Sequence, residues 1–162
     1  MENKKGHTSR QAGFTLLEIL LVVAAIAILA GIVIVAINPT KQLGDTRNAQ
    51  RHSDANTIIN AIYQYTIDEG SLPSGIDAVA GTSQVLGTAA SGCDSTCGAD
   101  TTVAACLDLS SDLAPDYIVD IPMDPSEGVA TNTDYYVNAA GNGRLTVGVC
   151  DPEQGAVIEI TR

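Results

Sequence analysis

The sequence predicts an α+β protein in which one long, kinked N-terminal helix packs its second half on a small antiparallel sheet. Three observations support this prediction. An apolar run of membrane-spanning length stands near the N-terminus, a segment with helical periodicity follows it, and short runs rich in β-branched residues end the chain. With 162 residues, the chain has room for one ordinary domain plus a membrane or targeting element.

The apolar run covers residues 14–37. Its 24 residues would form a helix of about 36 Å, which is enough to cross a hydrocarbon core of about 30 Å. A cleavable secretory signal normally has an apolar core of only about 7–15 residues. Residues 1–13, ahead of the run, hold three basic residues against one acidic residue, a bias that keeps this end in the cytoplasm. We therefore expect a single-pass protein whose remaining chain faces outward.

The outward-facing part of the chain is acidic. Residues 14–162 contain 5 basic and 18 acidic residues, which gives a formal charge of −13. Such a chain repels nucleic acid and anionic lipid, so no direct nucleic-acid binding is expected.

An amphipathic helix is expected over residues 38–69. Pro39 and Gly44 weaken its beginning, by a missing N–H donor and by backbone entropy, so a kink or a locally melted segment is expected there. Helical periodicity then returns in one apolar stripe, made of Ala55, Ile58, Ile59, Ile62 and Tyr65. The helix should end near Gly70 and Pro73.

Residues 70–162 are expected to form a globular head. Residues 71–105 are rich in Gly, Ser, Thr and Ala without a sustained period, which indicates a long surface loop. A short helix is expected over residues 106–113. Short runs rich in Val, Ile, Thr and Tyr then predict an antiparallel meander over residues 133–139, 143–150 and 155–160. A tight hairpin turn is expected at residues 141–143.

The head contains all four cysteines of the chain, Cys93, Cys97, Cys106 and Cys150. Disulfides persist in the oxidising space that this part of the chain faces, so we expect two of them and a stapled loop. The spacing does not resemble that of a paired CxxC zinc site. Four cysteines allow three pairings, and the sequence does not choose among them.

The chain lacks the residue patterns of a catalytic site. Residues 71–162 contain no histidine, and the two histidines of the chain are His7 in the leader and His52 on the amphipathic helix. His52 lies off the apolar stripe and is expected to be solvated. No phosphate-binding glycine motif is present, and serine without a neighbouring base is a weak nucleophile. We expect no enzyme activity and no cofactor.

One segment of the head is rich in acids. Hard oxygen ligands on a flexible loop suit calcium, although the spacing does not match an EF-hand loop. The candidate ligands are Asp120, Asp124, Glu127 and Asp134. The alternative is that these residues are solvated turn acids.

One acid, Glu18, interrupts the apolar run near its start. It stands four residues after Phe14, which is about one helical turn, so both residues share one face. A carboxylate inside a membrane costs on the order of 2.5–3.5 kcal/mol or more and usually marks a function with a partner. The alternative is a boundary acid that extends to the headgroups. Cleavage after Gly13 would supply a cationic partner, because Phe14 would then carry the N-terminal ammonium group.

The short basic leader, the motif "GFTLLE" and the apolar helix together resemble type IV pilins and the related pseudopilins of type II secretion. The stretches "DEGSLPSG" and "YIVDIPMDP" also look like parts of pilin and pseudopilin heads. The resemblance implies that a prepilin peptidase cuts after Gly13 and methylates the new N-terminus at Phe14. It also implies that Glu18 pairs with the terminal amine of a neighbouring subunit during assembly.

The resemblance implies a structural function, as a pilin-like subunit of a type IV pilus-like filament that polymerises through its N-terminal helix. The expected partners are further copies, other pilins, the peptidase, the membrane and an inner-membrane assembly platform. The subunit would sit in the cytoplasmic membrane and then in an extracellular or periplasmic filament. Two alternatives remain open: a secretion pseudopilin, and a signal-anchored extracellular binding protein that never polymerises.

Overall fold

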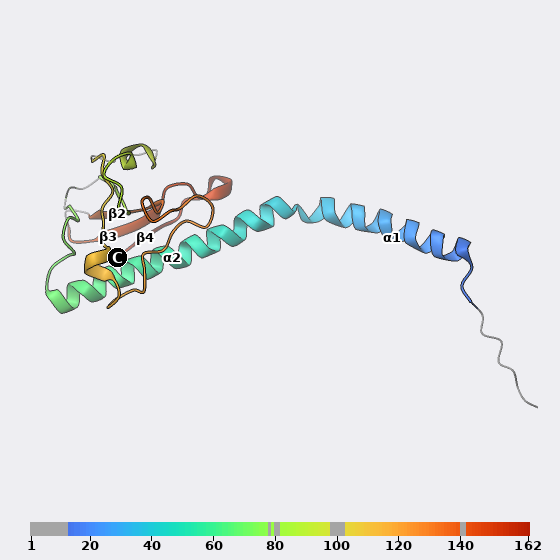
Figure 1. The fold of residues 1–162 in the computed structure, drawn as a ribbon, viewed down its shortest axis with the longest axis horizontal. Coiled ribbons are helices and arrows are strands. Elements are labelled where there is room, and N and C mark those ends of the chain that lie inside the picture. Colours follow the sequence, from blue (N-terminus) through green and yellow to red (C-terminus); the bar gives the residue numbers. More distant parts are fainter. Residues whose placement is uncertain (1–12, 78, 80–81, 98–102, 140–141) are drawn as a thin grey trace, which may run out of the picture. The chain divides into compact units, whose positions relative to one another are not determined.

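The computed structural model of the chain describes residues 13–77, 79, 82–97, 103–139 and 142–162 (Figure 1). The chain divides into two compact units, Met1–Pro39 and Thr40–Arg162. The expected leader before Gly13 and part of the expected hairpin turn lie outside the described residues.

The described part of the first unit is mainly helix α1, Leu16–Ile37. None of its 22 residues is buried. The helix ends at Asn38, whose φ of 48° and ψ of 77° belong to the left-handed region. Proline disfavours helical geometry in the residue before it, so Pro39 accounts for the position of this interruption.

Helix α2, Pro39–Glu69, follows at once and runs for 31 residues. The expectation that Gly44 would kink or melt the helix is wrong, because α2 continues through it. Gly44 is buried, and a Cβ atom there would lie 2.4 Å from Nε2 of Gln154 and 2.7 Å from Oε2 of Glu153. Glycine here leaves room for the side chains of Gln154 and Glu153, and this packing offsets its cost in backbone entropy.

The apolar stripe of α2 faces the core, as the sequence predicted. Its aliphatic members are fully or almost fully buried, and Tyr65 is half-buried in an edge-to-face contact with Tyr117 at 5.6 Å between ring centroids. The helix ends where predicted, because Gly70 has a φ of +73° and donates its N–H to the carbonyl of Thr66 at 3.0 Å.

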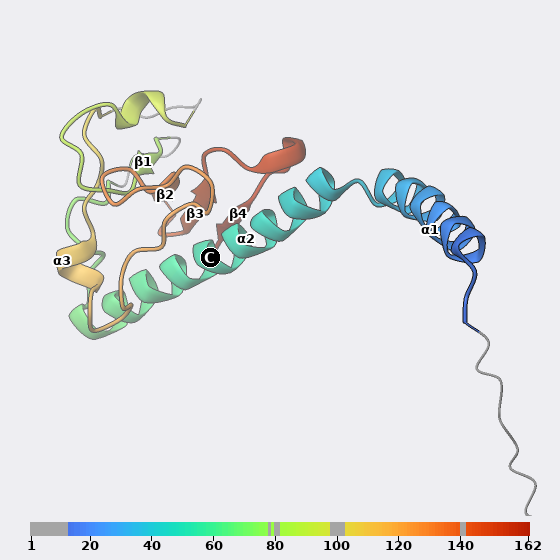
Figure 2. The same cartoon turned by 45° about the vertical axis from the view of Figure 1, so that its right-hand side comes forward.

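The second unit contains one four-stranded antiparallel sheet in the order β1-β2-β3-β4. Its strands are β1 Gln84–Val85, β2 Tyr135–Ala139, β3 Leu145–Val149 and β4 Glu159–Thr161. The predicted meander, and with it the α+β class, is confirmed. Figure 2 shows α2 running along one face of this sheet.

The core lies between α2 and that face. Alternate residues of β2 and β3 point into it and are buried, as the two-residue period of a strand requires. The opposite face of the sheet carries a second, small cluster in which Val85 packs with Cys93 and Cys97 and with the ring of Tyr136. That ring also covers Gly148, where any Cβ atom would clash with it at 2.3 Å.

Two expectations for the head need correction. Strand β1 lies within the segment that was expected to be loop throughout. The short helix is also shorter than expected: α3 spans only Ser110–Leu113. The backbone N–H groups of Cys106 and Leu107 instead donate to Ala89 and Val85, each at 2.8 Å, so this stretch runs alongside β1. Pairing of this kind between distant segments of the same chain overrides local helix propensity.

The last strand also differs from its prediction. Residues Glu153–Gly155 form a 3-10 turn, η2, and β4 begins only at Glu159. Gln154 within this turn has a φ of 60°. The turn packs against α2, where the Gln154 side chain donates to the carbonyl of Lys41 at 2.8 Å and Asn48 binds the backbone of Glu153.

Candidate functional site

The segment before α1 carries the first candidate residues. Gly13 and Phe14 are exposed, Phe14 by 77%. A Cβ atom added to Gly13 would meet no heavy atom within 4 Å. Packing within the described chain therefore does not require glycine at this position. A requirement for glycine would come from a partner that acts on this segment.

Thr15 and Glu18 form the start of α1. Thr15 is the N-cap, with φ −78° and ψ 152°, and its hydroxyl oxygen accepts a hydrogen bond from the backbone N–H of Glu18 at 3.2 Å. Glu18 is thus the third residue of the first turn, where a carboxylate is favoured by the helix dipole. The pattern T-x-x-E is a capping signature that could have been found in the sequence. It gives Glu18 a local role besides any role with a partner.

The surface of α1 is apolar on all sides. The helix is long and apolar enough to cross a membrane, with a mean hydropathy of 3.3 over an 18-residue window, and it is the only such helix among the described residues. Its large apolar side chains are between 48% and 83% exposed. Within the described chain they have no packing partner, so α1 needs lipid or other chains around it.

A second group of candidate residues joins α2 to the loops of the head. Arg51 is 1% exposed, and its guanidinium binds both carboxylate oxygens of Asp124, at 2.5 and 3.0 Å. It also donates to Glu153 at 3.2 Å. Arg47 binds both oxygens of Glu153, with 2.7 Å for the second contact. Asn48 exchanges hydrogen bonds with the backbone of Glu153 at 2.9 and 3.0 Å. We call Arg47, Arg51, Asp124 and Glu153 the arginine cluster.

The two acids of the arginine cluster are held in their charged form. Burial opposes the charge of Asp124, but hydrogen bonds from Arg51 and from the backbone N–H of Ser126 keep its pKa below the ordinary value. The hydrogen bond from Arg47 lowers the pKa of Glu153 to about 2, against some desolvation. The cluster is therefore fully ionised at neutral pH and fixes the η2 turn and the Asp124 loop to α2.

Sequence reasoning missed the arginine cluster. A signal for it exists, because Arg51 stands four residues before Ala55 and so extends the apolar stripe by one helical turn. A basic residue in line with a buried stripe needs an anionic partner.

The four calcium candidates do not form one group. The carboxylate of Asp120 accepts a hydrogen bond from the backbone N–H of Ile121 at 2.8 Å. The carboxylate of Asp124 is already paired with Arg51. Glu127 and Asp134 line the same open cavity as Asp124, whereas Asp120 lines a different one. In the part of the chain that is described, no three His, Cys, Asp or Glu residues are close enough to hold a metal ion.

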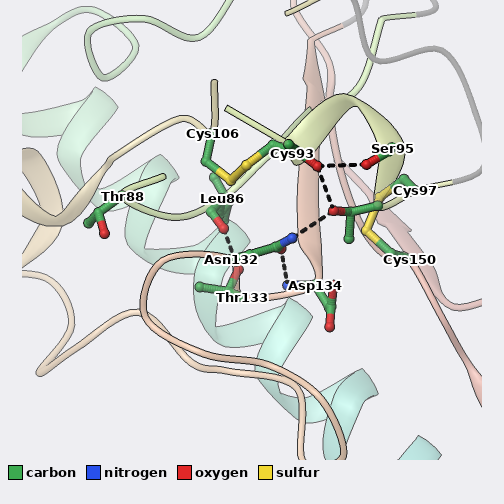
Figure 3. Close-up of a disulfide and its surroundings, with 12 residues drawn as sticks. Leu86, Thr88, Cys93, Ser95, Cys97, Cys106, Asn132, Thr133, Asp134 and Cys150 are labelled. Atoms are coloured by element: carbon green, nitrogen blue, oxygen red, sulfur yellow. Dashed lines mark hydrogen bonds between the residues drawn. A yellow bond between two sulfur atoms is a disulfide. The ribbon is translucent and has the colours of Figure 1, made fainter. Parts of the chain in front are cut away.

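The cysteines form two disulfides that fasten a loop over the outer face of the sheet (Figure 3). Cys93 pairs with Cys106, with their Cα atoms 5.2 Å apart, and Cys97 pairs with Cys150 at the end of β3, at 4.5 Å. This is one of the three pairings that the sequence left open. No cysteine of the chain is free.

Comparison with known proteins gives one match. Residues 8–34 fit a family model described as the prokaryotic N-terminal methylation motif, and this stretch contains Gly13, Phe14, Glu18 and most of α1. No curated protein and no solved structure matches the chain. The chain thus carries a prepilin-type signal, which supports a pilin-like or pseudopilin precursor anchored in the membrane, and the α+β head fits this type of fold.

Proposed function

We propose that this protein is a structural subunit of a type IV pilus-like filament. A prepilin peptidase would cut after Gly13 and methylate Phe14, and the mature chain would polymerise through α1. The observation that supports this most strongly is that the methylation motif coincides with a helix on which no side chain is buried. A helix of this kind is stable in lipid, and after leaving the bilayer it is stable only against similar helices. A bundle of α1 helices from many copies provides that environment.

Glu18 would select the incoming subunit. After cleavage, the amine at Phe14 is a cation about one helical turn from Glu18, so the two groups lie at nearly the same depth in neighbouring copies. In a medium of low dielectric constant their attraction is far stronger than in water. The capping contact with Thr15 does not replace this partner, because it uses the backbone N–H of Glu18 and leaves the carboxylate available.

Two experiments on the precursor test the processing step. The mature protein, isolated from membranes or sheared filaments, should have the mass of a chain that begins at Phe14 with one added methyl group. Gly13→Leu should leave the full-length precursor in the membrane, because the open space around Gly13 means that the variant still folds. A mature mass that is unchanged in this variant would contradict processing at this bond.

The assembly step is tested with Glu18→Gln in a strain that expresses no other copy. Glutamine keeps the size and the helix propensity but cannot pair with an ammonium group, so filament yield should fall by at least about tenfold while the processed protein accumulates normally. Thr15→Ala is the matched control, because it removes the cap but keeps the carboxylate, and it should retain most of the yield. Normal filaments from Glu18→Gln would make Glu18 a boundary acid.

The alternatives give different results. A pseudopilin would be processed in the same way, but its gene would stand beside genes for a secretion ATPase and an outer-membrane channel. An anchored binding protein that does not polymerise would retain residues 1–13 in its mature form.

A further inference from the structure

An open cavity of about 520 Å³ lies beside the arginine cluster, where β2 begins and β3 ends. We call it the acidic cavity. Its lining comes from α2 and from the loops next to the two strands: Arg47, Arg51, Asp124, Ser126, Glu127, Asp134, Asp151 and Glu153. Five carboxylates against two guanidinium groups leave a formal charge of −3. Both guanidinium groups are already committed to Asp124 and Glu153. The charge of the other three acids is therefore not compensated within the cavity.

Asp134 is the least favourable of these three acids. It is 7% exposed and has a φ of 61°, and its carboxylate forms no hydrogen bond or ion pair with any residue that the structure describes. Burial, followed by the charges of Asp124 and Asp151, raises its pKa. In Figure 3 its carboxylate points away from the disulfides. The carboxylate oxygens of Asp134 are therefore accessible only from the open cavity, because no buried side-chain oxygen of the described chain lacks a hydrogen-bond partner. A nearly buried acid that meets other acids there and no cation of its own copy suits a cationic ligand.

The spacing of the acids in the acidic cavity favours an organic cation over a metal ion. A metal ion needs several oxygen ligands at about 2.0–2.6 Å from one point, and no three acidic side chains in the described ranges are grouped closely enough. A guanidinium group presents five N–H donors on a planar fork and can bind carboxylates that lie apart from one another.

Among the basic side chains of the mature chain, one is a suitable cation. Residues 14–162 contain only five basic residues, of which Arg47 and Arg51 already line the cavity. Lys41 pairs with Asp45, and Arg162 binds Asn60. The fifth, Arg144, is exposed, and its guanidinium has no hydrogen-bond or ion-pair partner among the described residues.

Arg144 cannot reach the acidic cavity of its own copy. It precedes β3 at the tip of the β2–β3 hairpin, whereas Asp134 and Asp151 flank the open end of the same hairpin. The five paired residues between the two ends span about 17 Å at about 3.4 Å per residue. The unused cation and the unused acids therefore lie at opposite ends of one rigid element.

We propose that Arg144 of one copy inserts into the acidic cavity of a second copy and pairs with Asp134. The two surfaces are different, so the contact is head-to-tail, and repetition of such a contact gives an open polymer unless the rotation closes it into a ring. The inference rests on the proposed filament function and adds to it a contact between heads, separate from the contacts of α1.

A photo-crosslinking experiment on the full-length chain in its own membrane tests this contact. A photoreactive amino acid replaces Asn142, which is exposed beside Arg144 at the hairpin tip, in one tagged copy that is expressed together with a copy carrying a second tag. The expected product joins the two tagged copies through residues 124–134 or 150–153 of the second copy. A product with a different protein, or with another part of the second copy, would overturn the proposal.

Charge exchange supplies the second readout. Arg144→Glu should reduce the cross-linked product at least about tenfold, and Glu127→Lys with Asp151→Lys in the second copy should restore it. Both of these acids are exposed at the rim of the cavity, so the head should fold in each variant. Lys41→Glu, which makes the same change in net charge at an exposed residue, should leave the product unchanged. An unchanged product from Arg144→Glu, or no recovery on charge exchange, would refute the pairing.

The outcomes separate this contact from the proposed function. If the protein forms filaments that depend on Glu18 but the product is indifferent to Arg144→Glu, the head contact is refuted and the filament function stands. If no filaments form but the Arg144-dependent product appears between membrane-anchored copies, the filament function is refuted and the head contact stands.

Discussion

The two long helices of this chain place their apolar side chains in opposite environments. α1 buries none of its residues, whereas α2 buries Ile58, Ile59 and Ile62 completely against the sheet. The charged residues of the two helices differ in the same way. Arg51 of α2 pairs with acids of the head, whereas Glu18 of α1 has no ion-pair partner in the described chain. It follows that the head carries its own stability, while α1 takes its stability from lipid or from other copies.

This contrast is open to measurement because the chain contains no tryptophan and none of its five tyrosines lies in α1. Three of them lie in the head, and Tyr63 and Tyr65 lie on the part of α2 that packs against it. Tyrosine near-UV circular dichroism of the mature protein in detergent therefore reports unfolding of the head together with α2, and not of α1. Changes in α1 should leave this signal as it is and should alter assembly, while changes in the core of the head should do the reverse.

The largest effect on the head is expected from Arg51→Ala. The variant leaves Asp124 buried without its cation, and the loss of one partner of a buried ion pair typically costs about 3–5 kcal/mol of unfolding free energy. Urea unfolding followed by the tyrosine signal measures it. The double variant Arg51→Met with Asp124→Asn removes both charges and keeps an acceptor for the N–H of Ser126, so it should recover much of the loss. An Arg51→Ala head of normal stability would mean that the arginine cluster does not hold α2 to the head.

The next effect compares the two helices with one chemical change. Ile59→Ala should cost about 2–5 kcal/mol of unfolding free energy, because Ile59 is fully buried and its removal leaves a cavity. Ile26→Ala in α1, where the side chain is 60% exposed, should leave the head at its original stability and lower the filament yield. Equal losses of head stability from both variants would break the distinction between the two helices.

The sequence predicted the parts of the fold that follow from periodicity and end signals. Ile58, Ile59 and Ile62 were expected to be buried by their spacing, and Gly70 was expected to end α2. Strand β1 could not be predicted, because a two-residue strand has no measurable period and exists only through its pairing with β2. Gly44 was misjudged as a kink because intrinsic propensity does not include the loop that packs on it.

For the candidate sites, local motifs were readable and long-range pairs were not. Gly13, Phe14 and Glu18 lie within six consecutive residues, so one motif brings them together. Arg51 and Asp124 are 73 residues apart, and only the folded head shows that they pair. The disulfides are also long-range pairs, because Cys97 bonds to Cys150, which is 53 residues away in the sequence.

A smaller effect should distinguish the two disulfides of the head. In the chain-entropy treatment, a bond across 13 residues stabilises by about 3 kcal/mol and one across 53 residues by about 4 kcal/mol. Replacing Cys97 and Cys150 by serine should therefore cost about 1 kcal/mol more than replacing Cys93 and Cys106. Urea unfolding of the two double variants measures the difference, and thiol labelling of the unfolded, unreduced wild type should find no free thiol. The reverse order of stability would mean that local packing of the loop outweighs chain entropy.

The smallest effect is expected from Asp134→Asn, and it should be stabilising. Because burial and neighbouring acids raise the folded-state pKa of Asp134 above 3.8, its ionised form lowers the stability of the head at neutral pH, and this loss disappears as the pH falls below about 3.8. Asparagine does not titrate and tolerates the positive φ equally well, so the variant should gain about 0.5–1 kcal/mol at pH 7 and progressively less toward pH 3.5. Asp120→Asn makes the same chemical change at an exposed site and should shift neither value. The stabilised variant should also give less of the head-to-tail cross-link, because asparagine cannot form an ion pair with Arg144 of a second copy. A head destabilised by Asp134→Asn at pH 7 would instead mean that this carboxylate already has a stabilising partner within its own chain.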